Sequence, residues 1–179
     1  MYAALVAEAL KDVAPGPLVI VGHSFGGRIA VVLAARHPEL VGALVLTGAP
    51  LVKRTATARS PFVYRLLRGL HERGLLGDRR MESVRQRFGS TDYRNATGVM
   101  RGVLVATVNE SYEAELTEVL APVSMLWGAN DLDAPLASAE RAASLLRCPH
   151  RLRVLAGIGH LVPSEAPHEL AVAVKETLA

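Results

Sequence analysis

The sequence has almost no cysteine and no long apolar run. Its 179 residues include one cysteine, Cys148, so an internal disulfide cannot form. No stretch reaches the roughly 18 apolar residues of a membrane span, so we expect no membrane-spanning segment. The first residues carry no basic start, and Glu8 interrupts their apolar stretch, so we also expect no secretory signal. These absences favour a cytoplasmic protein of a reducing compartment.

Aromatic residues are scarce, at 4% of the chain, and the net charge is only +3. Residues 53–101 nevertheless hold 12 of the 20 Lys and Arg residues and 4 of the 17 Asp and Glu residues, so this segment is +8 and the remainder is −5. A basic segment of this kind either attracts anionic substrates or forms an ordinary solvated surface. No aromatic interleaving or nucleic-acid motif accompanies the arginines, so we expect no nucleic-acid partner.

What the sequence does contain is a regular alternation of apolar runs and helical patterns. Half of the residues are hydrophobic and 21% are charged, which is globular composition, and the length suits one domain. Strands buried on both faces are predicted at residues 18–21, 43–46, 123–127 and 152–155. Helices are predicted at residues 3–13, 28–36, 135–146 and 166–178. The alternation predicts an α/β fold, with a parallel sheet flanked by helices.

One long segment interrupts this alternation. Residues 51–118 show helical patterns, such as Phe62, Leu66 and Leu70 at a spacing of four and the stretch 99–108, but no convincing buried strand. We therefore predict a core formed by residues 1–50 and 119–179, with a helical insertion between its second and third strands.

A reactive serine is predicted at the end of the first strand. Residues 22–26, Gly-His-Ser-Phe-Gly, match the G-x-S-x-G pattern, in which a serine occupies a sharp strand-to-helix turn. A buried strand precedes the motif and an apolar helix follows it, as the turn requires. The motif glycines are expected because the backbone at Ser24 is strained and its neighbours cannot accept side chains. The alternative is a glycine-rich turn in which Ser24 only caps the helix.

A nucleophilic serine needs a base and a group that orients the base. His160 follows the fourth strand, at the sheet edge where catalytic loops gather, whereas alternation along the first strand directs His23 away from that side. Asp131 follows the third strand and is our choice of acid. Asp133 is the alternative acid, although an aspartate at that position commonly caps a helix. The chain order Ser24, Asp131, His160 is that of the α/β-hydrolases.

With these motifs, the chain resembles the α/β-hydrolase fold family, in particular small-molecule esterases and lactonases with a helical cap. The likeness rests on residues 22–27, 37–41, 127–135 and 159–160. It implies that an acyl group of a small-molecule substrate is transferred to Ser24 and then to water, or to another acceptor in a transferase. It also implies that residues 51–118 form the cap and that the Phe25 N–H is one oxyanion donor. No cofactor or metal is expected.

The resemblance also implies that something is missing. In family terms the chain matches strands five to eight, and the loop that supplies the second oxyanion donor belongs to the absent strands one to four. We expect the strand at residues 18–21 to leave an apolar edge, which invites pairing with a second copy or a partner chain. A fragment of a longer protein or a start assigned too late would explain the same pattern. The alternative function is therefore a catalytically impaired hydrolase-like domain that binds a ligand or a partner chain.

Overall fold

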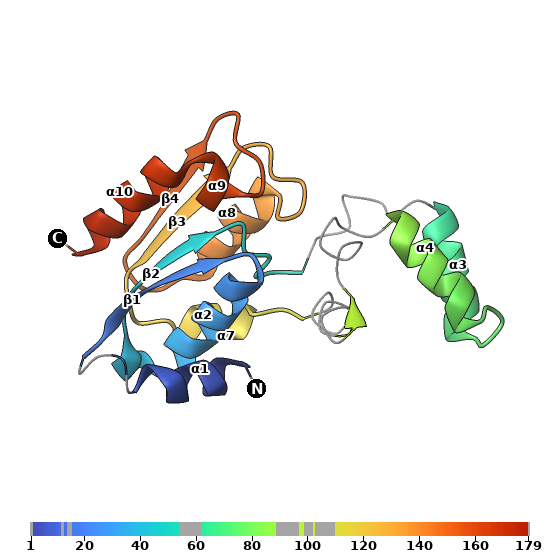
Figure 1. Cartoon of the computed structure of the whole chain (residues 1–179), viewed down its shortest axis with the longest axis horizontal. Coiled ribbons are helices and arrows are strands. Elements are labelled where there is room, and N and C mark those ends of the chain that lie inside the picture. The colour runs from blue at the N-terminus through green and yellow to red at the C-terminus, as the bar shows by residue number, and fades with distance from the viewer. Residues whose placement is uncertain are drawn as a thin grey trace. The chain divides into compact units, whose positions relative to one another are not determined.

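The computed structural model describes residues 2–11, 13, 16–53, 62–88, 97–98, 102 and 110–178. The chain divides into two compact units, one formed by Met1–Lys53 with Ser111–Ala179 and the other by Arg54–Glu110. The first unit contains a parallel sheet with helices on its faces (Figure 1). This architecture confirms the predicted α/β fold class.

Four strands form the sheet of the described residues, and they lie side by side in chain order. The strands are β1 (Leu18–His23), β2 (Val41–Thr47), β3 (Val123–Gly128) and β4 (His150–Leu155). Each neighbouring pair is parallel. Because the strands are parallel, their carboxyl ends share one edge of the sheet, where the loops carrying the predicted site residues begin.

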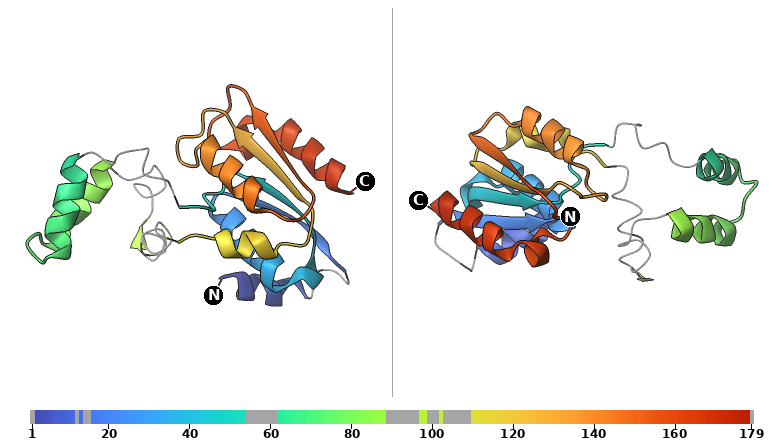
Figure 2. Two further views of the ribbon diagram at one scale, coloured as in Figure 1. Left: turned by 180° about the vertical axis from the view of Figure 1, so that it is seen from behind. Right: turned by 90° about the horizontal axis from the view of Figure 1, so that it is seen from above.

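Helices cover both faces of the sheet, which explains the continuous apolar runs. On one face lie α2 (Phe25–Arg36), α7 (Glu113–Glu118) and α8 (Leu136–Leu145), with α1 (Tyr2–Leu10) packed against α2. On the other face lie α9 (Val162–Glu165) and α10 (Pro167–Leu178). Figure 2 shows α10, in red, across the sheet from α8, in orange. A short 3-10 helix, η1 (Pro38–Leu40), leads into β2.

The predicted helices occur, but α1 ends at Leu10 rather than at the predicted Val13, and α2 begins earlier than predicted. The helix starts at Phe25, three residues before the predicted start at Arg28, so Gly26 and Gly27 lie inside it. The prediction assigned this glycine pair to the strand-to-helix turn of the G-x-S-x-G motif and began the helix after it. Close packing explains Gly27, since a Cβ atom there would overlap the Cβ of Ala49.

β1 forms one edge of the sheet that the described residues make, as predicted. Val21 on this strand is 46% exposed, and Leu5 on α1 is 63% exposed. Both are large apolar side chains that a covering element would bury. In the described residues, then, the predicted apolar edge at β1 is confirmed. No helix in this part of the chain is long and apolar enough to cross a membrane.

In the second unit, α3 (Phe62–Glu72) packs against α4 (Asp78–Phe88). Gly74 lies in the connecting turn with φ 74°, a left-handed conformation that glycine adopts without strain. Met81 of α4 is fully buried. The described residues of this unit contain no strand. The helical pattern predicted at 99–108 falls, apart from Gly102, outside the described residues.

Candidate active site

Ser24 lies in a strained turn between β1 and α2. Its φ is 48° and its ψ is −115°, and it is the one non-glycine residue in the described ranges with a positive φ. The Ser24 N–H donates to the Thr47 carbonyl at 2.9 Å, and the Ser24 carbonyl accepts from the Gly27 N–H at 3.1 Å. The Ser24 side chain makes no capping bond to α2. These bonds fix a conformation that a serine rarely adopts, and such outliers cluster at functional sites.

Only one of the two motif glycines is required by close packing. A Cβ atom at Gly22 would lie 2.7 Å from the Cα of Gly27, whereas a Cβ at Gly26 would meet nothing within 4 Å. The expectation that Gly26 cannot accept a side chain is therefore wrong. Gly26 lies on an exposed part of α2, and the crowded position is its neighbour Gly27.

The loop after β3 holds Asp131 by its own backbone. Asp131 Oδ1 accepts the N–H of Asp133 at 2.9 Å and that of Ala134 at 2.7 Å. The Trp127 indole N–H donates to the Ala134 carbonyl at 2.7 Å, which ties the end of the loop to the buried end of β3. One carboxylate oxygen of Asp131 is thus satisfied by the backbone, and its side chain is fully buried. Asp133, the alternative acid, contributes its backbone N–H to this bond with Asp131.

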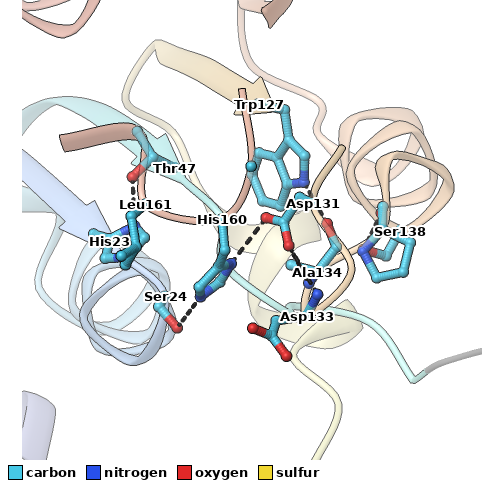
Figure 3. A network of polar contacts seen from close by, with 12 residues as sticks. His23, Ser24, Thr47, Trp127, Asp131, Asp133, Ala134, Ser138, His160 and Leu161 are labelled. Atoms are coloured by element: carbon cyan, nitrogen blue, oxygen red, sulfur yellow. Dashed lines mark hydrogen bonds and ion pairs between the residues drawn. The ribbon is translucent and has the colours of Figure 1, made fainter. Parts of the chain in front are cut away.

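His160 lies between the other two predicted residues (Figure 3). Its Nδ1 is 2.9 Å from Asp131 Oδ2, and its Nε2 is 3.1 Å from Ser24 Oγ. The side chain of His160 is 12% exposed. The structure therefore brings Ser24, Asp131 and His160 into one hydrogen-bonded chain, although 107 and 29 residues separate them in sequence.

Glycine at two positions lets the loops approach each other this closely. A Cβ atom at Gly128 would overlap the Gly159 carbonyl, and one at Gly48, where φ is 54°, would lie 3.0 Å from the His160 ring. Backbone bonds join the same loops, because the Asn130 N–H donates to the Ile158 carbonyl at 2.9 Å. The loop that carries Asp131 and the loop that carries His160 therefore form one connected structure.

The arrangement suits proton transfer from a hydroxyl group. A histidine hydrogen-bonded to both a serine and a buried carboxylate can remove the serine proton, and the carboxylate then stabilises the imidazolium ion. Phe25 is the first residue of α2, so its N–H has no acceptor within the helix and is available near Ser24. Among the described residues, no three His, Cys, Asp or Glu side chains cluster as a metal site would need.

Sequence reasoning missed the residues that surround His160. His23, which alternation directed away from the site, lies with its ring centroid 5.1 Å from that of His160, and its Nδ1 is 2.9 Å from Thr47 Oγ1. Glu165 accepts backbone N–H groups on both sides of His160. Glu165 follows His160 by five residues, at the end of a short helix. Its closeness in sequence to the predicted base was the one signal that could have identified it as a neighbour of His160.

Cys148 has no feature of a second nucleophile. It is half-buried, and this burial raises the pKa of its thiol. A raised thiol pKa lowers the thiolate fraction at neutral pH, and the thiolate is the reactive form. Cys148 is therefore better described as a partly buried packing residue than as a nucleophile.

The fold and this site define a class. The chain belongs to the alpha/beta hydrolase family, whose family model matches residues 2–174. Both the sheet of parallel strands and the Ser-Asp-His order fit that membership.

Similar proteins include curated sequences and solved structures. The chain is 29% identical to a pimeloyl-[acyl-carrier protein] methyl ester esterase of Aromatoleum aromaticum, over 96% of this chain and 78% of the esterase. It resembles the crystal structure of an esterase from Exiguobacterium antarcticum with a TM-score of 0.70 and 18% identity, over 99% of this chain and 72% of that one. It also resembles MGS-MChE2, an alpha/beta hydrolase from the metagenome of lagoon sediments at Mar Chica, Morocco, with a TM-score of 0.66 and 22% identity, over 97% of this chain.

The chain spans only part of the length of these relatives. It covers 66% of MGS-MChE2 and 57% of a predicted hydrolase from Thermoplasma acidophilum, which it matches with a TM-score of 0.58. These solved structures thus extend beyond the part that this chain matches.

Proposed function

We propose that the protein is a serine hydrolase that cleaves an ester or similar acyl bond of a small molecule through an acyl-Ser24 intermediate. The observation that carries the proposal is the continuous hydrogen-bonded chain from Ser24 Oγ through the His160 ring to the buried Asp131 carboxylate. The name of the Aromatoleum aromaticum relative, a methyl ester esterase, supports an ester as the substrate class.

In this mechanism His160 acts first as a base and then as an acid. Its Nε2 takes the proton of Ser24 Oγ while the oxygen attacks the acyl carbon, and the same proton passes to the departing alkoxide. Asp131 Oδ2 accepts from Nδ1–H, which fixes the tautomer and stabilises the imidazolium. Water then attacks the acyl-serine with His160 again as its base, and Ser24 is released together with the carboxylic acid.

The negative oxygen of the tetrahedral intermediate needs hydrogen-bond donors. We propose the Phe25 N–H as one of them, because the first N–H groups of a helix lack acceptors and carry partial positive charge. In many hydrolases of this class a second donor comes from a loop upstream of the nucleophile. The loss of one such donor lowers kcat by about 10²- to 10³-fold, so the Phe25 N–H is expected to contribute strongly to the rate.

We propose that the insertion predicted at residues 51–118 forms a cap over the substrate through its residues 54–110, since α7 at its end packs with the core. The support is that residues 54–110 form a compact unit of their own, inserted between β2 and β3. The segment 53–101 carries the charge of +8, which favours anionic substrates. Comparing kcat/KM for neutral and anionic esters of equal chain length tests this preference.

A fluorophosphonate probe tests the function directly, because it phosphonylates a serine only when that serine is activated as a nucleophile. Wild type is expected to gain one phosphonyl group, and Ser24→Ala none. Thr47, whose hydroxyl contacts His23 but not Ser24, offers a control in Thr47→Ser, which should be labelled like wild type. Equal labelling of wild type and Ser24→Ala would exclude this role for Ser24.

A second candidate function, binding through the edge of β1, has its own observation. Val21 on this edge is 46% exposed, and an edge strand presents backbone groups that another strand can pair with. The partner would be a second copy or a different chain, and the domain would then be catalytically impaired. Size-exclusion chromatography discriminates the two, because an active monomer contradicts this candidate and an inactive, associated chain supports it.

We also propose a cytoplasmic location. The support is the single cysteine, which suits a reducing compartment. Fractionation of the producing cell, followed by detection of the protein, tests it.

A further inference from the structure

We propose that Glu165 is a positioning residue, whose carboxylate holds the backbone on both sides of His160 and thereby sets the reach of its ring to Ser24. This inference rests on the proposed serine hydrolase function. Glu165 Oε2 accepts the Gly159 N–H at 2.8 Å, and Oε1 accepts the Leu161 N–H at 2.9 Å. The two oxygens of one side chain therefore hold the two residues that flank His160.

The carbonyl of His160 is held by the same turn. It accepts the Val162 N–H at 3.0 Å, and the Leu161 carbonyl accepts the Glu165 N–H at 2.9 Å. Together with the two carboxylate bonds, these contacts restrain the peptide groups before and after His160. Small rotations of those groups would move the ring, because the side chain follows its Cα atom.

The turn that supplies Glu165 is anchored in the protein core. Val162 is fully buried and Ala166 is 4% exposed, and both belong to the apolar cluster that includes Val45 of β2 and Leu126 of β3. Glu165 itself is exposed. Its carboxylate thus connects the loop that carries His160 to a short helix that packs on the sheet.

An ionised carboxylate is the group that this geometry requires. Both oxygens accept N–H bonds, and bonds to a charged acceptor are shorter and stronger than neutral ones. Glutamine has one acceptor oxygen, so its NH₂ group would face one of the two N–H donors. Aspartate keeps the charge but is one methylene shorter, so it cannot contact both amides as Glu165 does. Substitution by glutamine therefore tests the need for the charge and the second acceptor oxygen, and substitution by aspartate tests the need for the length of the side chain.

The experiment compares Glu165→Gln and Glu165→Asp with Glu140→Gln, a control that alters an exposed glutamate on α8. Hydrolysis of p-nitrophenyl acetate is measured per folded molecule. We expect both Glu165 variants to lose about 10- to 100-fold in kcat with KM within about twofold of wild type, since misplacement of a catalytic group acts on the reaction step. Glu140→Gln should match wild type.

A kcat for Glu165→Gln within about twofold of the control, or a rise in KM alone, would overturn the proposal. If Glu165→Gln does not fold, Glu165→Asp decides by the same criteria. A second readout needs no turnover: the proton resonance of His160 Nδ1–H, which Asp131 shifts downfield, should weaken or move in Glu165→Gln but not in Glu140→Gln. If wild type shows no hydrolysis, the proposed function fails. The Nδ1–H resonance then tests the positioning role by itself. An unchanged resonance in Glu165→Gln would overturn that role.

Discussion

Asp131 and Glu165 each accept two backbone N–H groups, yet they act on different parts of His160. Asp131 uses a single oxygen for both backbone bonds, which leaves Oδ2 for the imidazole ring. Glu165 uses one oxygen for each bond and contacts only the backbone around His160. The Asp131 side chain is fully buried, and Glu165 is exposed.

The difference shows how one fold separates two tasks. In the proposed mechanism, a buried carboxylate next to the ring stabilises the charge that develops on His160, and a low-dielectric environment strengthens that interaction. An exposed carboxylate on the backbone contributes little to that charge stabilisation, because water screens it. Its contribution is geometric. Changes at Asp131 should therefore cost far more activity than changes at Glu165.

The largest effect is expected from Asp131→Asn. The amide can still accept backbone N–H bonds, but it no longer stabilises the imidazolium ion or the required tautomer of His160, so kcat should fall by about 10⁴-fold. Hydrolysis of p-nitrophenyl acetate measures this loss. The matched control is Asp133→Asn, which alters the alternative acid two residues away. Equal losses in the two variants would refute the choice of Asp131.

Two glycine substitutions compare the ring side of His160 with its backbone side. Gly48→Ala places a Cβ 3.0 Å from the ring at a φ of 54°, whereas Gly159→Ala places one 3.3 Å from both Glu165 oxygens. The ring cannot shift without disturbing its bonds to Asp131 and Ser24, so Gly48→Ala should lower kcat by about 100-fold. The exposed Glu165 side chain can adjust by the few tenths of an ångström that the new Cβ needs, so Gly159→Ala should lower kcat only a few-fold. The reverse order of the two losses would contradict this account of the loop.

A smaller effect, on stability, is expected at the glycine pair that begins α2. Gly27→Ala adds a Cβ that overlaps the Cβ of Ala49, and overpacking of this kind costs about 1–3 kcal/mol. Gly26→Ala adds a Cβ in open space, and alanine favours helices by up to about 1 kcal/mol over glycine. Urea unfolding curves of the two variants should move in opposite directions. Similar destabilisation by both would show that Gly26 is required after all.

The smallest effect concerns Cys148, away from both carboxylates. Because burial raises the pKa of its thiol, the thiolate fraction at a given pH is smaller in the folded protein than in the unfolded chain. Its reaction with a thiol reagent at pH 8 should therefore be slower in the native protein than in urea. Faster labelling of the native protein would indicate an activated thiol.

The sequence was sufficient for the four strands and for the residues that meet at their carboxyl ends. Each strand is a short apolar run with a loop directly after it, so local pattern and parallel topology together predict that Ser24, Asp131 and His160 converge. The packing details were not predictable in this way. Whether Gly26 or Gly27 is crowded depends on where α2 crosses Ala49, and the role of Glu165 depends on how the turn after His160 folds back.

The central claim, an acyl group carried by Ser24, is tested most directly by trapping the intermediate. The protein is mixed with p-nitrophenyl acetate and quenched with acid within the first turnover. It is then digested, and the mass of the peptide that contains Ser24 is measured by mass spectrometry. We predict that this peptide gains the mass of one acetyl group in wild type and that the gain is absent in Ser24→Ala. Release of p-nitrophenol by wild type without an acetylated Ser24, or undiminished release by Ser24→Ala, would contradict the mechanism.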